Sequence, residues 1–260
     1  MMVRALIAFA LLQAVPATPG QAPERAPVPP FPFQVGEAFE YVGKLGMLTL
    51  GTASMSVVKL DTIRGNETFV LRFQLTASTF VFKMDDVMHS WARTSDMVSL
   101  RFYQEFDEDG KLRRRYYDIF PDSGFYRERE RKEQKPTVTE PLDDAAFFYY
   151  IRTTPLEVGK TYSINRYFQQ DKNPVTIEVV KREKCELPDN QETTCLVLHP
   201  VINADKNGMF APRADARIWL TDDARRIPVQ IRSKLGFGTV TLKIKSMKLP
   251  GQPGTPGSAH

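Results

Sequence analysis

The segment IWLTDDARRIPVQIRSKLGFGTVTLKI, residues 218–244, constrains the fold most, because apolar residues alternate with polar ones in three successive stretches. A period of two is that of β-strands with one buried face. Asp222 and Asp223 supply turn-forming side chains between the first two stretches, and Gly236 and Gly238 do so between the last two. The segment therefore predicts three consecutive strands joined by two short turns.

The same alternation recurs upstream, where short runs rich in Gly, Asp and Asn separate strand-like segments. Glu108, Asp109 and Gly110 form the clearest hairpin turn. We expect strands at Phe39–Leu45, Met47–Leu60, Thr68–Ser78, Val87–Thr94, Leu100–Asp107, Lys111–Phe120, Phe125–Lys132, Lys160–Phe168, Val175–Lys184 and Thr194–Leu198. So many strands with short connections predict a mainly β fold, a curved antiparallel sheet that forms a barrel or half-barrel, with a sandwich as the alternative.

One segment has helical rather than strand periodicity. Asp143 or Asp144 can cap the start of AAFFYYIRT, and Pro155 ends it. Ala146, Phe147, Tyr150 and Ile151 fall at helical spacing. We expect one short aromatic helix that packs on the sheet or plugs its mouth.

The first seventeen residues have the pattern of a secretory signal peptide: Arg4, an apolar run, then small residues. This run is too short to span a bilayer, and no later segment is long and apolar enough to do so. Residues 18–32 are rich in proline and predict a flexible spacer, residues 33–249 a single β-rich domain, and residues 250–260 a flexible tail. We therefore expect an exported protein of the periplasm or cell envelope of a Gram-negative-type bacterium, not membrane-spanning.

Charge argues against nucleic acid as a partner. The chain has 35 Lys and Arg against 31 Asp and Glu, spread along its length. A nucleic-acid binder concentrates its basic residues on one surface. We expect no nucleic-acid partner.

The chain has only two cysteines, Cys185 and Cys195, on either side of the polar loop ELPDNQETT. In an oxidising compartment this spacing favours a disulfide across the neck of a hairpin. A redox or metal-binding pair is the alternative, but it lacks close spacing and histidine partners.

No catalytic constellation is recognisable. His89 and His199 have no further ligands at metal-binding spacing, and no nucleophile elbow or phosphate loop is present. The only acid–base candidate is His89 with Asp85 or Asp86. We expect no enzyme activity, metal or cofactor.

The run RERERKE, Arg127–Glu133, alternates in charge. As a strand it would be wet on both faces, which favours an exposed sheet edge protected by charge. An anion-binding row of arginines is the alternative.

Apolar residues around two segments give a candidate ligand site. Phe80, Phe82 and Met84 alternate in TFVFKMDD, Met88 and Trp91 follow, and the expected helix adds aromatic residues. Such side chains suit acyl chains if the curved sheet encloses a cavity, and a filled core is the alternative. The expected ligand-binding residues are Phe80, Phe82, Met84, Trp91, Phe147 and Tyr150.

Three segments together resemble the bacterial exported family known as domain of unknown function 3108 (DUF3108). They are FPFQVGEAFEYVGKLGMLTLGTASMSV, YYIRTTPLEVGKTY and the 218–244 segment. The family pattern matches here Tyr149, Tyr150, Arg152, Thr153, Pro155, Leu156 and Gly159, then Trp219, Leu220, Asp223, Arg226, Ile227, Pro228 and Val229. The resemblance implies an envelope protein with a curved antiparallel sheet, and it brings no agreed catalytic or binding residues.

That architecture is similar to the carriers of lipoproteins to the outer membrane, although this chain lacks a lipid-attachment cysteine. We therefore expect a non-enzymatic exported protein that binds a lipid or other apolar ligand in its curved sheet. The alternative is a structural or scaffolding protein that contacts other envelope proteins, for instance through Arg127–Lys132. A hydrolase of an envelope polymer is the third hypothesis.

Overall fold

The computed structural model describes residues 31–78, 83–202, 209–236 and 238–250, which contain fourteen strands and one α-helix. The strands are β1 (Ala38–Leu45), β2 (Leu48–Ile63), β3 (Asn66–Ser78), β4 (Lys83–Arg93), β5 (Ser99–Glu108), β6 (Lys111–Phe120), β7 (Phe125–Glu128), β8 (Gln134–Pro136), β9 (Thr161–Ile164), β10 (Val175–Glu186), β11 (Glu192–Ile202), β12 (Arg217–Thr221), β13 (Pro228–Leu235) and β14 (Gly238–Lys248). The helix is α1 (Asp144–Thr153), and 3-10 turns lie at Pro121–Ser123, Gln170–Lys172 and Pro212–Ala214.

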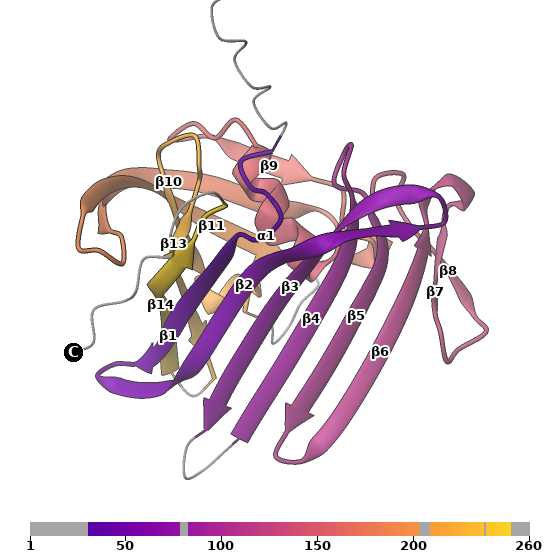
Figure 1. The fold of residues 1–260 in the computed structure, drawn as a ribbon, viewed down its shortest axis with the longest axis horizontal. Helices are drawn as coiled ribbons and strands as arrows, with labels where there is room; N and C mark the ends of the chain where they lie inside the picture. The colour runs from indigo at the N-terminus through magenta and orange to yellow at the C-terminus, as the bar shows by residue number, and fades with distance from the viewer. Residues whose placement is uncertain (1–30, 79–82, 203–208, 237, 251–260) are drawn as a thin grey trace, which may run out of the picture. The chain divides into compact units, whose positions relative to one another are not determined.

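All fourteen strands form one antiparallel sheet in the order β8-β7-β6-β5-β4-β3-β2-β1-β14-β13-β12-β11-β10-β9. Strands that follow one another in sequence are neighbours, except β8 and β9, and the first strand β1 also pairs with the last strand β14 (Figure 1). The short strands β8 and β9 form the two edges and do not pair with each other, so the sheet stays open. The predicted mainly β fold is confirmed as an open curved sheet with one short helix.

The sheet curves because its ladders are interrupted repeatedly. Register shifts occur in six of the strand pairs, including β1–β2 at Gly43/Lys44 and β2–β3 at Val57/Lys59. Such bulges bend a strand and increase its twist. Gly51 lets β2 approach β3 closely, since a Cβ there would lie 1.9 Å from the carbonyl oxygen of Thr76. The curvature gives strands β1–β6 an inner face, on which α1 packs, and an opposite outer face.

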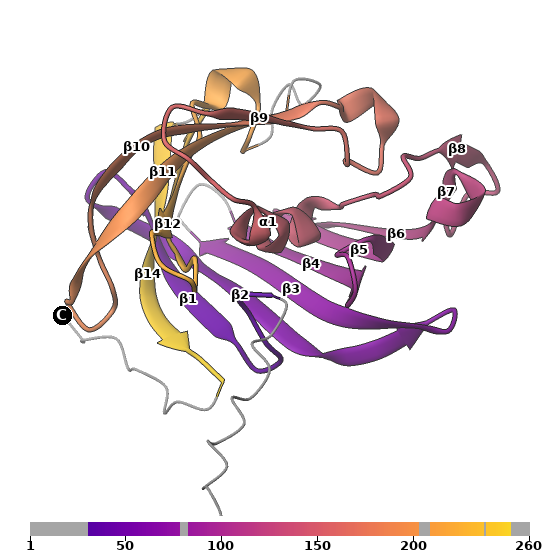
Figure 2. The same cartoon turned by 90° about the horizontal axis from the view of Figure 1, so that it is seen from above.

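Helix α1 lies between the two ends of the curved sheet (Figure 2). The ring of Phe148 stacks on Phe73 of β3 at 5.5 Å between centroids, and Phe210, which follows β11, lies 5.5 Å from the same ring. Because both sides of the helix are covered, Phe147, Phe148 and Tyr149 are all buried, and Tyr150 is only partly buried. The predicted helix is confirmed. The helical spacing of its apolar residues did not show that it would be buried on a second side, where Phe210 packs.

Two predicted strands are shorter than expected. The predicted strand Phe125–Lys132 stops at Glu128, and the chain turns there, with the Arg131 amide donating to the Glu128 carbonyl, before β8 pairs with β7. The run Arg127–Glu133 is therefore mostly a turn, not a charged edge strand. The predicted strand Lys160–Phe168 is reduced to β9, because the backbone of residues 166–168 hydrogen-bonds to Leu142 instead of a neighbouring strand.

The described residues contain no helix that is both long and apolar enough to cross a bilayer. The expected signal peptide, most of the proline-rich spacer and the C-terminal tail after Pro250 lie outside the described residues. At the end of the expected spacer, Phe31 already packs on Phe69 of β3 in an edge-to-face contact, 5.8 Å between centroids. The folded unit thus includes the residues just before Phe33.

Candidate binding faces of the sheet

A buried ion pair joins the end of α1 to the start of β1. Arg152 donates to both carboxylate oxygens of Glu37 at 2.6 and 3.0 Å, and their side chains are 0% and 3% exposed. The same guanidinium donates to the backbone carbonyls of Pro32 and Arg225, each at 3.0 Å. Arg152 therefore holds three segments that are distant in sequence.

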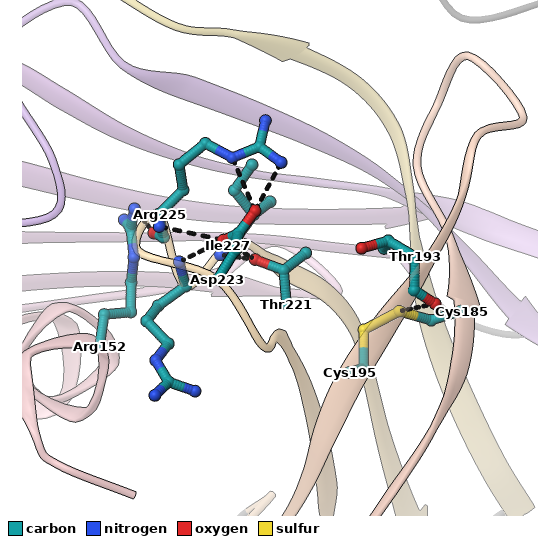
Figure 3. A network of polar contacts seen from close by, with 9 residues as sticks. Arg152, Cys185, Thr193, Cys195, Thr221, Asp223, Arg225 and Ile227 are labelled. Carbon is teal, nitrogen blue, oxygen red and sulfur yellow. Dashed lines mark hydrogen bonds and ion pairs between the residues drawn. A yellow bond between two sulfur atoms is a disulfide. The ribbon is translucent and has the colours of Figure 1, made fainter.

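The turn between β12 and β13 presents one of those carbonyls (Figure 3). Asp223 Oδ1 accepts a hydrogen bond from the Thr221 hydroxyl at 2.7 Å and from the Arg225 amide at 3.0 Å. The Ile227 amide in turn donates to the Thr221 oxygen at 2.8 Å. The predicted turn chemistry at Asp223 is confirmed. The two motif segments thus meet where buried Arg152 donates to the Arg225 carbonyl, whereas the side chains of Asp223 and Arg225 are 35% and 45% exposed. These contacts hold the fold together.

Cys185 and Cys195 form a disulfide within the β10–β11 hairpin, as predicted (Figure 3). Its cysteines are ten residues apart in the sequence. In the ladder, Cys195 is opposite Glu183 and Cys185 is opposite Thr193, so the two cysteines lie diagonally across the hairpin. Closing so short a loop contributes about 2–3 kcal/mol by restricting the unfolded chain.

The start of α1 is fixed to the inner face by Asp143. One carboxylate oxygen accepts from the amides of Ala145 and Ala146 at 3.0 and 2.9 Å, and the other accepts from the Ser90 hydroxyl at 2.6 Å. The Asp143 amide donates to the hydroxyl of Ser99 at 3.1 Å. Burial raises the pKa of Asp143 to about 7, against the lowering effect of these hydrogen bonds. Asp143 is fully buried, so this carboxyl positions the helix and does not face a ligand.

Partly buried apolar side chains extend along the inner face beyond the helix. The register pairs Met88 with Phe73, the residue under Phe148, so residues at even steps from Met88 on β4 share this face. We call the inner strip the set Leu75, Met84, Met88 and Phe106, all partly buried. Phe80 and Phe82, the other predicted ligand-binding residues of this segment, lie outside the described residues.

One carboxyl lies within the inner strip. Asp86 is between Met84 and Met88 on β4 and opposite Phe106 on β5. Burial, and then the charge of Glu108, raises the pKa of Asp86 to about 6, and its Oδ1 has no hydrogen-bond partner among the described residues. The strip is therefore mainly apolar around Asp86, with Glu108 opposite Met84 and Arg113 opposite Phe106 at its margin.

The predicted ligand-binding residues divide between different environments. Met84 belongs to the inner strip, whereas Phe147 is packed in the core with 4% exposure. Tyr150 packs at the edge of the core, with the guanidinium of Arg166 4.6 Å from its ring centroid. Trp91 lies on the outer face, because it is an odd number of residues from Met88 on the same strand, and it packs against Ile63, Val98 and Leu100. The expectation that Trp91 shares a lining with the other residues is wrong, and ligand binding at the rest stays a prediction.

The outer face carries a line of aromatic and basic side chains that crosses the strands. The ladder register places Arg72, His89, Tyr103 and Tyr116 directly opposite one another on β3, β4, β5 and β6. The ring of Tyr103 is 6.0 Å from that of His89 and 4.3 Å from that of Tyr116. The guanidinium of Arg129 lies 4.8 Å from the centroid of Tyr116. We call these five residues the outer row.

The outer row does not contain the acid–base pair considered from sequence. His89 Nε2 is buried and has no hydrogen-bond partner among the described residues. Asp85 accepts hydrogen bonds from Gln74 and Thr76 at 2.9 and 3.2 Å, and Asp86 lies on the inner face. Burial, followed by the charge of Arg72, lowers the pKa of His89. The predicted pair is thus not brought together.

Surface hollows are open and mixed in polarity. One of about 250 Å³ adjoins the outer row and is lined by Glu40, Tyr41, Thr52, Ala53, Ser54, Gln74, Thr76 and Lys245. Another of about 260 Å³ lies beside the disulfide and Trp219. Over the described ranges, no group of three or more His, Cys, Asp or Glu is placed to hold a metal ion.

Sequence reasoning missed the outer row and the partner of Arg152. Each strand shows its own alternation, but register decides which residues of different strands stand side by side, and register depends on bulges such as the one between Trp91 and Ala92. Glu37, 115 residues from Arg152, gives no sequence signal of pairing. Arg152 is a charged residue that follows a run of apolar and aromatic residues in the helix, and this was the available hint that it has a buried partner.

Comparison with known proteins places this fold in context. A family model described as protein of unknown function (DUF3108) matches residues 40–245. No curated protein matches the chain. Among solved structures, a β-barrel-like protein of the domain of unknown function DUF1849 from Brucella abortus is similar, with a TM-score of 0.55 and 10% identity over 84% of this chain and 98% of that chain. At that identity, the similarity concerns the fold alone.

Proposed function

The chain belongs to the DUF3108 family, and on that premise we propose that it is an exported, non-enzymatic protein of the cell envelope that binds a lipid or other apolar ligand on the inner face of its sheet. The signal-like residues 1–17 and the disulfide, which suits an oxidising compartment, support export. The family description gives no activity, so the proposal depends on the faces of the sheet.

The inner strip is the observation that carries the proposal. Its four apolar side chains are partly buried and lie on the adjacent strands β3, β4 and β5, and two of them, Leu75 and Met88, pack against the core. Covering such a strip with an acyl chain removes apolar surface from water, about 25 cal/mol for each Å². Thioether side chains such as Met84 and Met88 adapt to ligands of varied shape.

The packing around α1 sets the limits of this site. The helix and Phe210 fill the inner face around Phe73 and Phe148, so a ligand would lie beyond the helix instead of under it. The site is therefore a shallow, one-sided surface, which suits one acyl chain better than a bulky apolar molecule.

Adjacent residues on β4 provide a matched test. Met88 and Val87 are both partly buried but point to opposite faces. We expect Met88→Glu to abolish binding of a fluorescent fatty acid to the purified chain and Val87→Glu to leave it unchanged. Equal binding by both variants, or no binding by the wild type together with no lipid in native mass spectrometry, would reject the proposal.

A second function, scaffolding, is favoured by apolar residues at hairpin ends. Met47 and Leu48 at the β1–β2 turn are 98% and 69% exposed, and Leu112 near the β5–β6 turn is 47% exposed. Exposed apolar residues of this kind mark surfaces that contact other proteins. A photocrosslinking residue at position 47 is expected to trap a defined envelope partner in cells, and one at exposed Thr62 is not. The absence of any specific adduct at position 47 would reject scaffolding through this end.

A further inference from the structure

The outer face of β1–β6 is covered at one end by the β2–β3 hairpin, where Asp61 and Ile63 contact Trp91 and Arg64 contacts Phe120. No described element packs on the rest of this face. Figures 1 and 2 show α1 and strands β9–β11 all on the other side of these strands. Yet the part beyond the hairpin carries Tyr103 and Tyr116, both partly buried, where a simple solvated face would carry small polar residues. Aromatic side chains held in place on an uncovered sheet indicate a binding surface.

Charge on this face is one-sided. The outer row and the two registered rows beside it contain five arginines, Arg72, Arg101, Arg114, Arg127 and Arg129, and two carboxylates, Glu105 and Asp118. Asp118 pairs with Arg101 at 3.0 Å and more loosely with Arg129 at 3.5 Å, and Glu105 pairs with Arg114 at 2.6 Å. Arg72 donates to the neutral Gln74 at 2.7 Å and has no carboxylate partner among the described residues. Guanidinium groups bind carboxylates through two parallel hydrogen bonds, so the surplus favours an acidic partner.

The charged residues and the aromatic residues of the outer row occupy different positions along it. Arg72 and Arg129 stand at opposite ends of the outer row, with His89, Tyr103 and Tyr116 between them. Neighbouring strands are about 4.8 Å apart, so the row is extended and crosses several strands. Burial, together with the hydrogen bond to Glu105, raises the pKa of Tyr103 to about 12, so its hydroxyl keeps its proton. The centre of the row is uncharged and its ends are cationic.

The hollow of about 250 Å³ beside the row supplies hydrogen-bonding groups. Ser54 lies opposite Gln74 on the neighbouring strand, and Thr52 lies opposite Thr76. Gln74 and Thr76 donate to Asp85, and Glu40 also lines the hollow. The hydroxyls of Ser54 and Thr52 match a ligand with many hydroxyl groups. The face thus combines ring surfaces, hydroxyl partners and cations along one direction.

We propose that the outer face of β1–β6 binds an acidic polysaccharide strand, with sugar rings against Tyr103 and Tyr116, sugar hydroxyls in the adjacent hollow, and carboxylates at Arg72 and Arg129. Sugar rings present C–H groups to aromatic faces, and their acidic groups can be spaced along the chain. Single-stranded nucleic acid also uses aromatic and basic residues, but it carries a phosphate at every nucleotide and would bring phosphates against Glu105 and Asp118. This site is separate from the inner strip and does not depend on an apolar ligand.

Affinity electrophoresis of the full exported chain tests the proposal, with polygalacturonate, neutral dextran and oligothymidylate as probes. We expect retardation by polygalacturonate and none by dextran. Tyr103→Ala with Tyr116→Ala, and separately Arg72→Gln with Arg129→Gln, are each expected to weaken binding at least about tenfold. Arg182→Gln, which removes an exposed arginine from β10, is the matched charge control and is expected to change binding less than about twofold.

The arginine pair keeps the test open if the tyrosine variant unfolds, and thermal melting identifies that case. Equal binding by the wild type and the arginine pair would overturn the proposal, as would stronger retardation by oligothymidylate. Concentration-dependent dimerisation abolished by the same substitutions would also overturn it, because the face would then be occupied by a second copy. Fatty-acid binding measured on the same variants separates this result from the proposed function, since the inner strip is untouched.

Discussion

The two faces of strands β3–β6 both carry aromatic residues, but they use them differently. On the inner face, Phe73 and Phe102 are buried under the helix and its neighbouring segments, with no polar atoms to satisfy. On the outer face, Tyr103 and Tyr116 keep their polar atoms near arginines and carboxylates. The difference shows that alternation along a strand separates aromatic residues by polarity as well as by burial.

Carboxyl groups differ between the faces in the same way. Burial raises the pKa of Asp143 and of Asp86 on the inner side. The hydrogen bond from Arg114, followed by that from Tyr103, lowers the pKa of Glu105 on the outer side. These two inner carboxyls therefore keep their protons to a higher pH than a free aspartate does, whereas Glu105 is ionised down to a lower pH than a free glutamate.

The largest expected effect is at the buried ion pair. Arg152→Ala leaves Glu37 charged and unpaired inside the protein and removes the donor to two carbonyls, so we expect the free energy of unfolding to fall by about 5 kcal/mol. Urea unfolding measures it. The double variant Arg152→Met, Glu37→Met is expected to regain part of the loss. A single variant as stable as the wild type would show that the inner side does not depend on this pair.

Next is the aromatic core of the inner face. Phe148→Ala removes a ring that packs between Phe73 and Phe210 and leaves a cavity, so we expect a loss of ~3–4 kcal/mol. Urea unfolding again provides the measurement, with Phe148→Leu as the milder control. A loss below about 1 kcal/mol would mean that the helix is not held by this packing.

A pH dependence distinguishes the faces further. Because the pKa of Asp143 is about 7 in the folded protein and 3.8 in the unfolded reference, the folded state holds the proton more tightly. Its contribution to stability is complete below about pH 4 and is lost as the pH rises through about 7. Asp143→Asn is therefore expected to flatten the decline in the free energy of unfolding over this range, measured by urea unfolding at several pH values. An unchanged slope would show that Asp143 is ionised at its buried site.

The smallest effect is expected on the outer face. Tyr103→Ala removes cross-strand ring contacts with Tyr116 and His89 but opens no internal cavity, so we expect a loss of only ~0.2–1 kcal/mol. Differential scanning calorimetry beside Phe148→Ala gives the direct comparison of faces. Comparable losses in the two variants would contradict this difference between the faces.

Much of this fold was readable from local patterns. The three strands of residues 218–244 and their turns at Asp223 and Gly236 appear as predicted, as do the hairpin at Asp109 and Gly110 and the capped helix. Each depends on interactions within a few residues: alternation, a side-chain cap, or a turn that needs positive φ. The disulfide belongs to the same class, because a short hairpin brings its two cysteines together.

The sequence by itself thus determined the strands, the turns, the helix and the polarity of each face, since these follow from neighbours along the chain. Only the tertiary structure decided that β1 pairs with β14, that Arg152 meets Glu37, and that Arg72, His89, Tyr103 and Tyr116 form one row. Trp91 is an example. A bulge follows it in the ladder with β5, and such a bulge, or a shift of one residue along a strand, moves a side chain to another row or to the other face. Register is fixed by the packing of the whole sheet, and no single strand contains it.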